Sequence, residues 1–222
     1  MKVNKDIINN SVSAQNQVKK KVKFFERDDA QLKILFLGNS ITLHEIAPSI
    51  GWNNDWGMAA SKRENDYVHV VVSELEKAQR VSYSVCNVSD WEWRFYDEGV
   101  LSLYKKVKDF NADVVIVRLG ENVSRDDLAK YDFAFYLKKF IEYFVRPETK
   151  LVITDTFWEY EPICKAEEKV AKALKADFVS ISDLGYKNEN KAIGEYAHAG
   201  VASHPNDTGM RRIAERILSK LM

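Results

Sequence analysis

The chain has 222 residues, of which 45% are hydrophobic and 30% are charged, and its 33 basic side chains balance 33 acidic ones. This length is sufficient for one folded core, while the zero net charge gives no electrostatic basis for binding nucleic acid or an anionic membrane. No stretch reaches the ~20 apolar residues of a membrane-spanning helix.

Residues 1–30 fit no strand–helix unit, and we expect them to form an N-terminal extension with at most a helix over residues 12–24. A single domain is then expected over residues 31–222. The basic run Lys19–Lys23 is followed at once by acidic residues, which is typical of a solvated stretch. Because the extension lacks the apolar core of a signal peptide, the sequence predicts a cytoplasmic protein.

After residue 30, short apolar runs alternate with longer segments of helical periodicity. The runs predict five strands, at residues 32–37, 81–86, 113–119, 150–154 and 177–181. The longer segments predict helices at residues 66–79, 101–110, 128–144, 163–174 and 207–221. Strands that alternate with helices form right-handed crossovers, so this order predicts a flavodoxin-like three-layer α/β/α sandwich around a five-stranded parallel sheet.

The segments that follow the predicted strands carry the chemically informative side chains. Ser40 comes two residues after the first strand, and His204 lies on a loop just before the last helix. Ligands of open parallel sheets bind beyond the carboxyl ends of the strands, where these segments meet. A serine hydroxyl needs a base within hydrogen-bond reach to act as a nucleophile, so Ser40 and His204 form a candidate pair. His198 is an alternative base, and His44 and His69 are expected to be surface or packing residues.

Three short motifs resemble those of the SGNH (GDSL-type) hydrolases and occur in the same order. They are Leu37-Gly38-Asn39-Ser40-Ile41-Thr42, Gly120-Glu121-Asn122 and His204-Pro205-Asn206. The first motif has Asn39 where the family usually has aspartate. The resemblance implies the SGNH hydrolase fold, with Ser40 as nucleophile and His204 as general base and then acid. It also implies that the Ser40 N–H and the Asn122 side-chain amide stabilise the oxyanion.

One departure from the family pattern concerns the oxyanion hole. Glu92 stands where the family has a glycine whose N–H is a third oxyanion donor. The backbone N–H of Glu92 could still supply that donor, since any residue except proline has one. The Glu92 carboxylate would then have to point away from the oxyanion or pair with Arg94 or Arg118. Alternatively, the Glu92 side chain only braces the loop. Both interpretations remain open at this point.

A second departure concerns the acid of the usual triad. The family places an aspartate three residues before the histidine, and this chain has Val201 there. We therefore predict a Ser–His dyad in which a backbone carbonyl orients the imidazole of His204. The alternative is an acid from elsewhere in the chain, with Asp155, Asp183 and Glu195 as candidates. The role of such a group is to hold the tautomer and to stabilise the imidazolium.

All five tryptophans follow strand ends, and four of them, Trp52, Trp56, Trp91 and Trp158, are predicted to line the substrate pocket. Indole rings stack on sugars and line acyl pockets, although they also pack long loops against one another. No histidine pair has the spacing of a zinc site, and neither a metal nor another cofactor is expected. The two cysteines, Cys86 and Cys164, are expected to be buried thiols.

The sequence and the resemblance together predict a serine esterase that hydrolyses a small acyl ester, most simply an acetyl group on a carbohydrate. A general short-chain carboxylesterase or thioesterase is the nearest alternative. A different class is an inactive module of the same fold that binds a glycan through its tryptophans. A phosphate-binding loop at residues 38–42 is disfavoured, because it has one glycine and leaves His204 and Asn122 unexplained. The expected partner is a small-molecule ester, and no oligomeric state follows from the sequence.

Overall fold

The computed structural model describes residues 22–222, whose centre is a six-stranded sheet in the order β1-β3-β2-β4-β5-β6. The strands are β1 (Val22–Phe25), β2 (Leu32–Gly38), β3 (Val81–Asn87), β4 (Val114–Arg118), β5 (Lys150–Thr154) and β6 (Asp177–Val179). Neighbouring strands from β3 to β6 are all parallel. The five predicted strands and their parallel arrangement are therefore confirmed.

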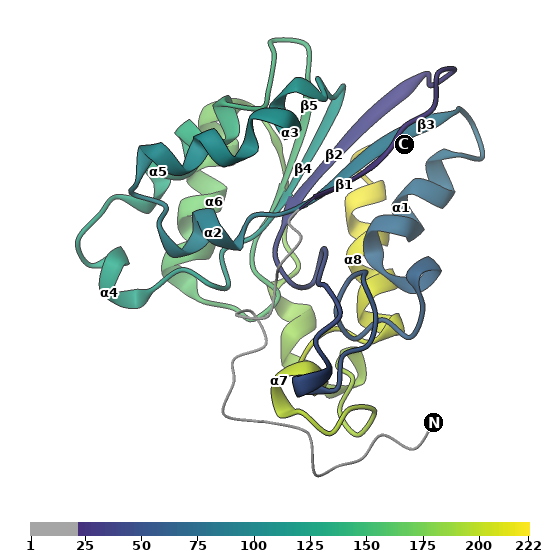
Figure 1. The fold of residues 1–222 in the computed structure, drawn as a ribbon. Helices are drawn as coiled ribbons and strands as arrows, with labels where there is room; N and C mark the ends of the chain where they lie inside the picture. Colours follow the sequence, from purple (N-terminus) through teal and green to yellow (C-terminus); the bar gives the residue numbers. More distant parts are fainter. Residues whose placement is uncertain (1–21) are drawn as a thin grey trace.

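Helices cover both faces of this sheet, as Figure 1 shows. They are α1 (Tyr67–Leu75), α2 (Ser89–Trp93), α3 (Lys105–Asp109), α4 (Arg125–Leu128), α5 (Phe133–Glu142), α6 (Glu161–Leu174), α7 (Ala199–Ala202) and α8 (Asp207–Leu218). In β2, Leu35 and Leu37 pack under α2, α3, α5 and α6, while Ile34 and Phe36 pack under α1 and α8. This alternation produces the predicted three-layer α/β/α sandwich. Within residues 22–222, no helix is long and apolar enough to cross a membrane.

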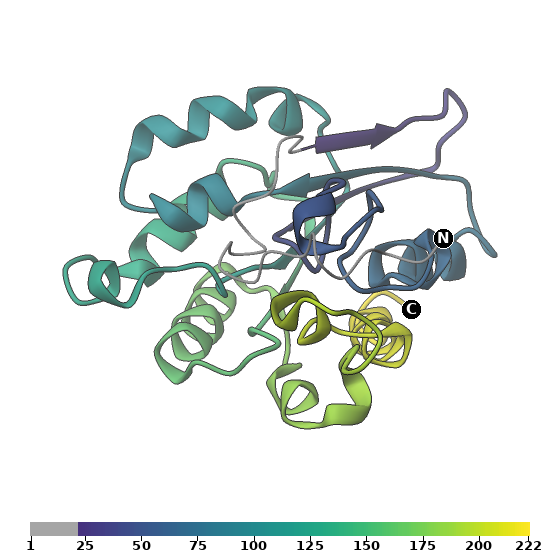
Figure 2. The ribbon, with the colours of Figure 1, turned by 60° about the horizontal axis from the view of Figure 1, so that its bottom comes forward.

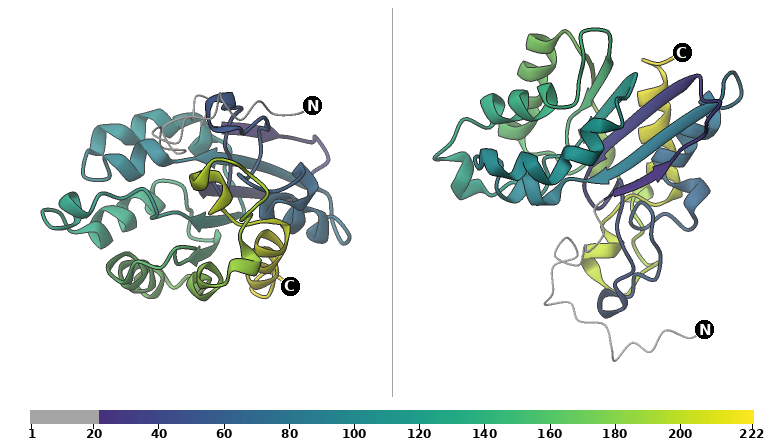
Figure 3. Two further views of the ribbon diagram at one scale, coloured as in Figure 1. Left: turned by 90° about the horizontal axis from the view of Figure 1, so that it is seen from below. Right: turned by 45° about the horizontal axis from the view of Figure 1, so that its top comes forward.

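The sheet has one more strand than predicted. β1 pairs antiparallel with β3 at the edge of the sheet, with Val22 opposite Cys86 (Figure 3). Phe25 stacks on Tyr83 with 4.4 Å between ring centroids, and the Lys23 ammonium lies 2.5 Å from an Asp55 carboxylate oxygen. An antiparallel edge strand needs no crossover helix, so the strand–helix alternation gave no sign of it.

This strand corrects two expectations about the N-terminal residues. The helix over residues 12–24 is wrong at its end, because Val22–Phe25 is extended and part of the sheet. The rest of that helix lies outside the described residues. The division into an extension and a single domain stays a prediction.

Two long segments pack together beyond the carboxyl ends of the strands. Ala47, Ile50 and Trp52 of the first segment form an apolar cluster with Ala192 and Val201 of the second. Figure 2 shows the dark-blue segment after β2 beside the yellow-green segment that contains α7. Short 3-10 helices lie in these and neighbouring loops: η3 (Pro48–Ile50), η4 (Arg63–Asn65), η5 (Glu98–Tyr104), η6 (Ser182–Tyr186) and η7 (Asn188–Asn190). The first segment begins at Ser40 and the second leads to His204.

Candidate active site

Ser40 and His204 meet at the carboxyl edge of the sheet. The Ser40 Oγ lies 2.8 Å from Nε2 of His204, and both residues are 5% exposed. The turn before Ser40 requires a glycine, since a Cβ on Gly38 would lie 1.9 Å from Oγ1 of Thr42 and 2.5 Å from the Arg118 carbonyl oxygen. The structure thus brings together the two residues that the sequence paired.

A backbone carbonyl orients the imidazole of His204. Its Nδ1 lies 2.6 Å from the carbonyl oxygen of Gly200 in α7, and that oxygen also accepts the Ser203 hydroxyl at 2.9 Å. Because Nδ1–H donates to this carbonyl, Nε2 is left as an acceptor for the Ser40 hydroxyl. This is the arrangement expected of the predicted dyad.

The three carboxylates considered as triad acids lie elsewhere. Asp155 accepts hydrogen bonds from the backbone of Ile181 and from the Ser180 hydroxyl, at 2.5 and 2.7 Å. Asp183 is paired with an arginine of α8, and Glu195 is exposed on its loop. Among the described residues, none of these carboxylates is hydrogen-bonded to His204.

The other histidines have packing roles. His198 caps α7, with its Nδ1 accepting the Val201 N–H at 3.3 Å, and it does not line the cavity above Ser40. His44 is fully buried, and its Nδ1 lies 2.7 Å from the carbonyl oxygen of Glu45. His69 lies 2.7 Å from a carboxylate oxygen of Asp66.

Burial lowers the pKa of His204 to about 3, although its hydrogen bond to the Gly200 carbonyl opposes this shift. The nearby His44 and Arg118 lower the pKa further. A lowered pKa keeps the imidazole neutral near pH 7, with a lone pair on Nε2 for the Ser40 proton.

Glu92 is a bracing residue and not an oxyanion donor. Its backbone N–H bonds to the Val88 carbonyl at 3.1 Å within the first turn of α2, so this N–H is not available to a ligand. Its buried carboxylate accepts the Asn122 side-chain amide at 2.7 Å and the Gly120 N–H at 2.6 Å. Of the two interpretations of Glu92, the structure therefore contradicts the backbone donor and supports the brace.

The Ser40 N–H makes no hydrogen bond with the described residues, so it can point a donor at a bound carbonyl group. The Asn122 amide has two N–H groups, and one of them is held by Glu92. The second Asn122 N–H remains for a ligand at the cavity that both residues line. Ser40 and Asn122 therefore each have an N–H without a partner among the described residues at this cavity.

A buried charged network lies behind these donors. Arg118 forms an ion pair with Glu121 at 2.6 Å, and Asn39 links Glu121 to Glu92, with distances of 2.6 and 3.0 Å from its side-chain nitrogen. Burial alone would raise the pKa of Glu121, but the Arg118 guanidinium holds it below its ordinary value. Burial and the Glu121 charge raise the pKa of Glu92. Asn39 is thus a fixed link in the network, which explains why an amide occupies the aspartate position of the first motif.

Glu167 of α6 adds a buried carboxyl with no partner close to this network. It is 1% exposed, and neither of its oxygens has a hydrogen-bond partner among the described residues. It packs behind Gly120, whose φ of +116° places a hypothetical Cβ 2.9 Å from Oε1 of Glu167. Burial, reinforced by Glu121, raises the pKa of Glu167 well above its ordinary value.

This raised pKa predicts a pH-dependent stability. The unfolded chain loses the Glu167 proton near pH 4.5 while the folded chain keeps it, so folding becomes less favourable as the pH rises above that value. The slope is at most about 1.4 kcal/mol per pH unit. In urea unfolding between about pH 5 and 8, we expect Glu167→Gln to flatten this decline. Glu168→Gln, on the exposed face of the same helix, should retain it, and equal slopes in the two variants would contradict the assignment.

The cavity above Ser40 has a volume of about 370 Å³. It is lined by Ser40, Glu121, Asn122, Trp158, Gly200, Ser203 and His204. The ring of Trp158 meets that of His204 edge to face, with 5.0 Å between centroids. Trp158 is therefore the one predicted pocket tryptophan that the structure places at this cavity.

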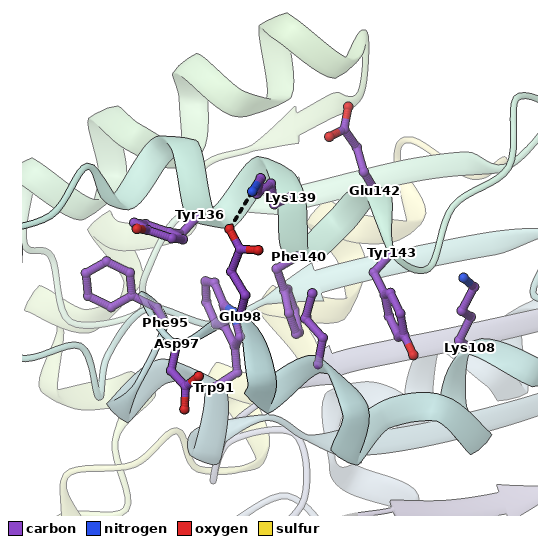
Figure 4. Close-up of a pocket in the computed structure, with 11 residues that line it drawn as sticks. Trp91, Phe95, Asp97, Glu98, Lys108, Tyr136, Lys139, Phe140, Glu142 and Tyr143 are labelled. Atoms are coloured by element: carbon purple, nitrogen blue, oxygen red, sulfur yellow. Dashed lines mark hydrogen bonds and ion pairs between the residues drawn. The ribbon is translucent and has the colours of Figure 1, made fainter.

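The other three predicted pocket tryptophans lie elsewhere. Trp52 is fully buried in the loop cluster, and Trp56 packs on it with its Nε1–H bonded to the Ala60 carbonyl at 2.9 Å. Trp91 stacks on Phe140 at 4.2 Å and lines a separate cavity of about 380 Å³ between α2, η5 and α5 (Figure 4). These indoles fill the spaces under long loops and helices, which is the packing alternative for loop tryptophans.

The sequence did not single out Gly200 and Ser203 of the cavity, or the link from Asn39 to Glu121. The one sequence signal for this link was the charged side chain of Glu121 between the motif residues Gly120 and Asn122. The two cysteines form no disulfide, and Cys164 is only partly buried, contrary to the expectation for that residue. Within residues 22–222, no group of three or more histidine, cysteine and acidic side chains could hold a metal ion.

The sequence matches no protein-family model and no curated protein. The structure, however, is similar to several solved structures. A lipase/acylhydrolase from Enterococcus faecalis is 15% identical with a TM-score of 0.57, over 86% of this chain and 95% of that one. The acetyl xylan esterase AlAXEase is 17% identical with a TM-score of 0.54, over 86% of this chain and 100% of that one.

A family 3 carbohydrate esterase from Clostridium thermocellum is 17% identical with a TM-score of 0.53, over 85% of this chain and 94% of that one. At such identities the likeness concerns the fold. The strand order, the three motifs at the carboxyl edge and the Ser40–His204 contact agree with this likeness in fold. The chain has the fold of the SGNH hydrolases.

Proposed function

We propose that the protein is a serine esterase that removes a small acyl group, acetyl, from a carbohydrate. The observation that carries the proposal is the 2.8 Å contact between Ser40 Oγ and His204 Nε2, at a cavity that Asn122 also lines. A nucleophile bonded to a base that a third group orients is the arrangement of acyl-transfer enzymes. Two of the similar structures described above are an acetyl xylan esterase and a carbohydrate esterase, which supports the choice of substrate.

In the acylation step, the Ser40 oxygen attacks the ester carbonyl carbon as His204 takes the hydroxyl proton on Nε2. The carbonyl oxygen becomes an oxyanion, to which the Ser40 N–H and the free Asn122 N–H donate. Each preorganised donor of this kind contributes about 3–4 kcal/mol to transition-state stabilisation. The C–O bond to the alcohol then breaks, and His204 gives its proton to the departing oxygen.

In the deacylation step, His204 removes a proton from water, which attacks the acyl carbon bound to Ser40. The same two donors stabilise the second oxyanion, and the carboxylic acid leaves as Ser40 recovers its proton from His204. The Gly200 carbonyl holds Nδ1–H throughout both steps. It fixes the tautomer, and its partial negative charge favours the imidazolium that forms in each transition state.

The lining of the cavity favours a short acyl group. Ser203, Gly200 and Asn122 present small or polar groups, and Trp158 is the single large apolar side chain among the lining residues. A long hydrocarbon chain gains binding energy only from a long apolar surface, which this cavity does not offer. An acetyl group needs little such surface.

An alkyl fluorophosphonate tests both the nucleophile and the state of its base. We expect it to add covalently to the wild type, as seen by intact mass, and not to Ser40→Ala. Because the pKa of His204 is about 3, the labelling rate should be nearly constant from about pH 5 to 8. Equal labelling of Ser40→Ala would contradict the proposal, whereas a rate that falls with a midpoint near the ordinary histidine value would show that burial does not lower the pKa of His204. Circular dichroism at each pH confirms that the protein is folded.

A further inference from the structure

A second cavity, of about 220 Å³, lies beside the one above Ser40, and the two share Glu121 and Trp158. The second cavity is lined by Gly120, Glu121, Val123, Arg125, Thr156, Trp158, Glu159 and Tyr160. It therefore combines aromatic rings with charged groups of both signs. Because the two cavities share these two wall residues, a ligand bound at Ser40 can extend into the second cavity.

The position of Trp158 indicates which part of an ester would enter this second cavity. His204 gives its proton to the departing alcohol, so the alcohol must lie next to the imidazole. Trp158 packs against that imidazole at 5.0 Å and forms the wall common to both cavities. The alcohol part of the substrate thus passes along Trp158 toward the second cavity.

Arg125 distinguishes the second cavity from a general sugar site. Its guanidinium lies over the Tyr160 ring, 4.7 Å from the centroid. Among residues 22–222, Arg125 and Arg211 are the arginines without an ion pair. Only Arg125 of these two lines a cavity described here. Its planar group matches the geometry of a carboxylate and can donate two parallel hydrogen bonds to it.

The acidic side chains near Arg125 leave its charge available. Glu159 lines the same cavity and its carboxylate accepts the Tyr186 hydroxyl, but among the described residues it forms no ion pair with Arg125. Asp126 and Asp127 follow Arg125 in α4, but neither lines the cavity. Glu121 is neutralised by its ion pair with the buried Arg118.

We infer that the second cavity is the subsite for the alcohol part of the substrate, and that it takes a hydroxylated ring bearing a carboxylate, as in a uronic acid. The ring lies along Trp158, and its carboxylate binds the Arg125 guanidinium. Glu159 accepts a ring hydroxyl. This inference rests on the proposed esterase function and makes Arg125 a specificity-determining residue.

Matched aryl acetates test the role of Arg125 in turnover. 3- and 4-Acetoxybenzoate carry a carboxylate on the alcohol part, and the corresponding acetoxybenzamides have the same shape without the charge. For at least one isomer, the wild type should prefer the acid to the amide in kcat/KM by about 10- to 100-fold, the range of a charge-assisted contact. Arg125→Gln should reduce this ratio to about one. Arg211→Gln removes the same charge from an exposed site on α8 and should keep the ratio.

Binding to the Ser40→Ala variant provides a measurement that does not depend on catalysis. By calorimetry, D-galacturonate should bind about 10-fold more tightly than D-galactose, and adding Arg125→Gln should remove the difference. The inference would be overturned if neither the kcat/KM ratio nor the binding measurement showed a preference for the acid. It would also be overturned if Arg125→Gln and Arg211→Gln reduced that preference equally. If no ester is hydrolysed but the binding preference and its dependence on Arg125 are found, the esterase proposal fails while the acidic-sugar subsite stands.

Discussion

Replacing Ser40 with alanine is expected to lower kcat for 4-nitrophenyl acetate by about 10⁴- to 10⁶-fold. The hydroxyl that bonds Nε2 of His204 is then absent, and no covalent intermediate can form. His204→Ala should cause a loss of similar size, because the hydroxyl keeps its proton without a base. Since the two groups act as one unit, the double variant should be little worse than either single variant.

Stopped-flow or plate assays at neutral pH measure this effect, and Ser219→Ala is the matched control. Ser219 follows α8, and its hydroxyl donates to the Arg216 carbonyl, so the same change in chemistry there should leave turnover intact. Activity that survives in Ser40→Ala at the wild-type level would exclude Ser40 as the nucleophile. A wild type inactive on this ester and on acetylated sugars would instead favour the glycan-binding module.

The second large effect is expected from Glu92 acting through Asn122. Both carboxylate oxygens of Glu92 accept hydrogen bonds, from the Asn122 side-chain amide on one and from the Gly120 N–H on the other. A glutamine has one acceptor oxygen, so its NH₂ group must face one of these donors. We expect Glu92→Gln to turn the Asn122 amide and to lower kcat by about 10- to 100-fold, part of the loss typical of a missing oxyanion donor.

A double-mutant cycle separates positioning from a general structural effect. Asn122→Ala alone should lower kcat by about 10²- to 10³-fold. If Glu92 works by holding Asn122, adding Glu92→Gln to Asn122→Ala should cost little more. KM should change less than kcat in each variant, since the contact is made in the transition state. Multiplicative losses in the double variant, or losses confined to KM, would show that Glu92 does not act through Asn122.

The sequence predicted the parallel sheet well because its strands are buried on both faces. Val114–Arg118 is apolar for four consecutive residues, and such a run has few interpretations other than a central strand. The same reasoning located Ser40 and His204, since each lies at a turn beyond the carboxyl ends of the strands. It did not locate β1, whose residues form an edge strand that pairs with the sheet on one side only.

The depth and direction of side chains could not be predicted in the same way. Trp52, Trp91 and Trp158 each follow a strand, yet only Trp158 reaches the cavity above Ser40. Which indole packs inward depends on the space between loops that are distant in sequence. The contact between Glu92 and Asn122 likewise joins segments 30 residues apart and has no local pattern.

The use of the Gly200 carbonyl to orient His204 has a consequence for mutational robustness. A triad aspartate can be lost through a single codon change, and its loss in a serine protease costs about 10⁴-fold in kcat. A main-chain carbonyl belongs to every amino acid, so no replacement at position 200 deletes the oxygen itself. The orienting group is vulnerable only through displacement of α7, whose Val201 is anchored in the loop cluster with Trp52. Random mutagenesis should therefore find inactivating changes in the packing beneath α7 and not at the orienting atom.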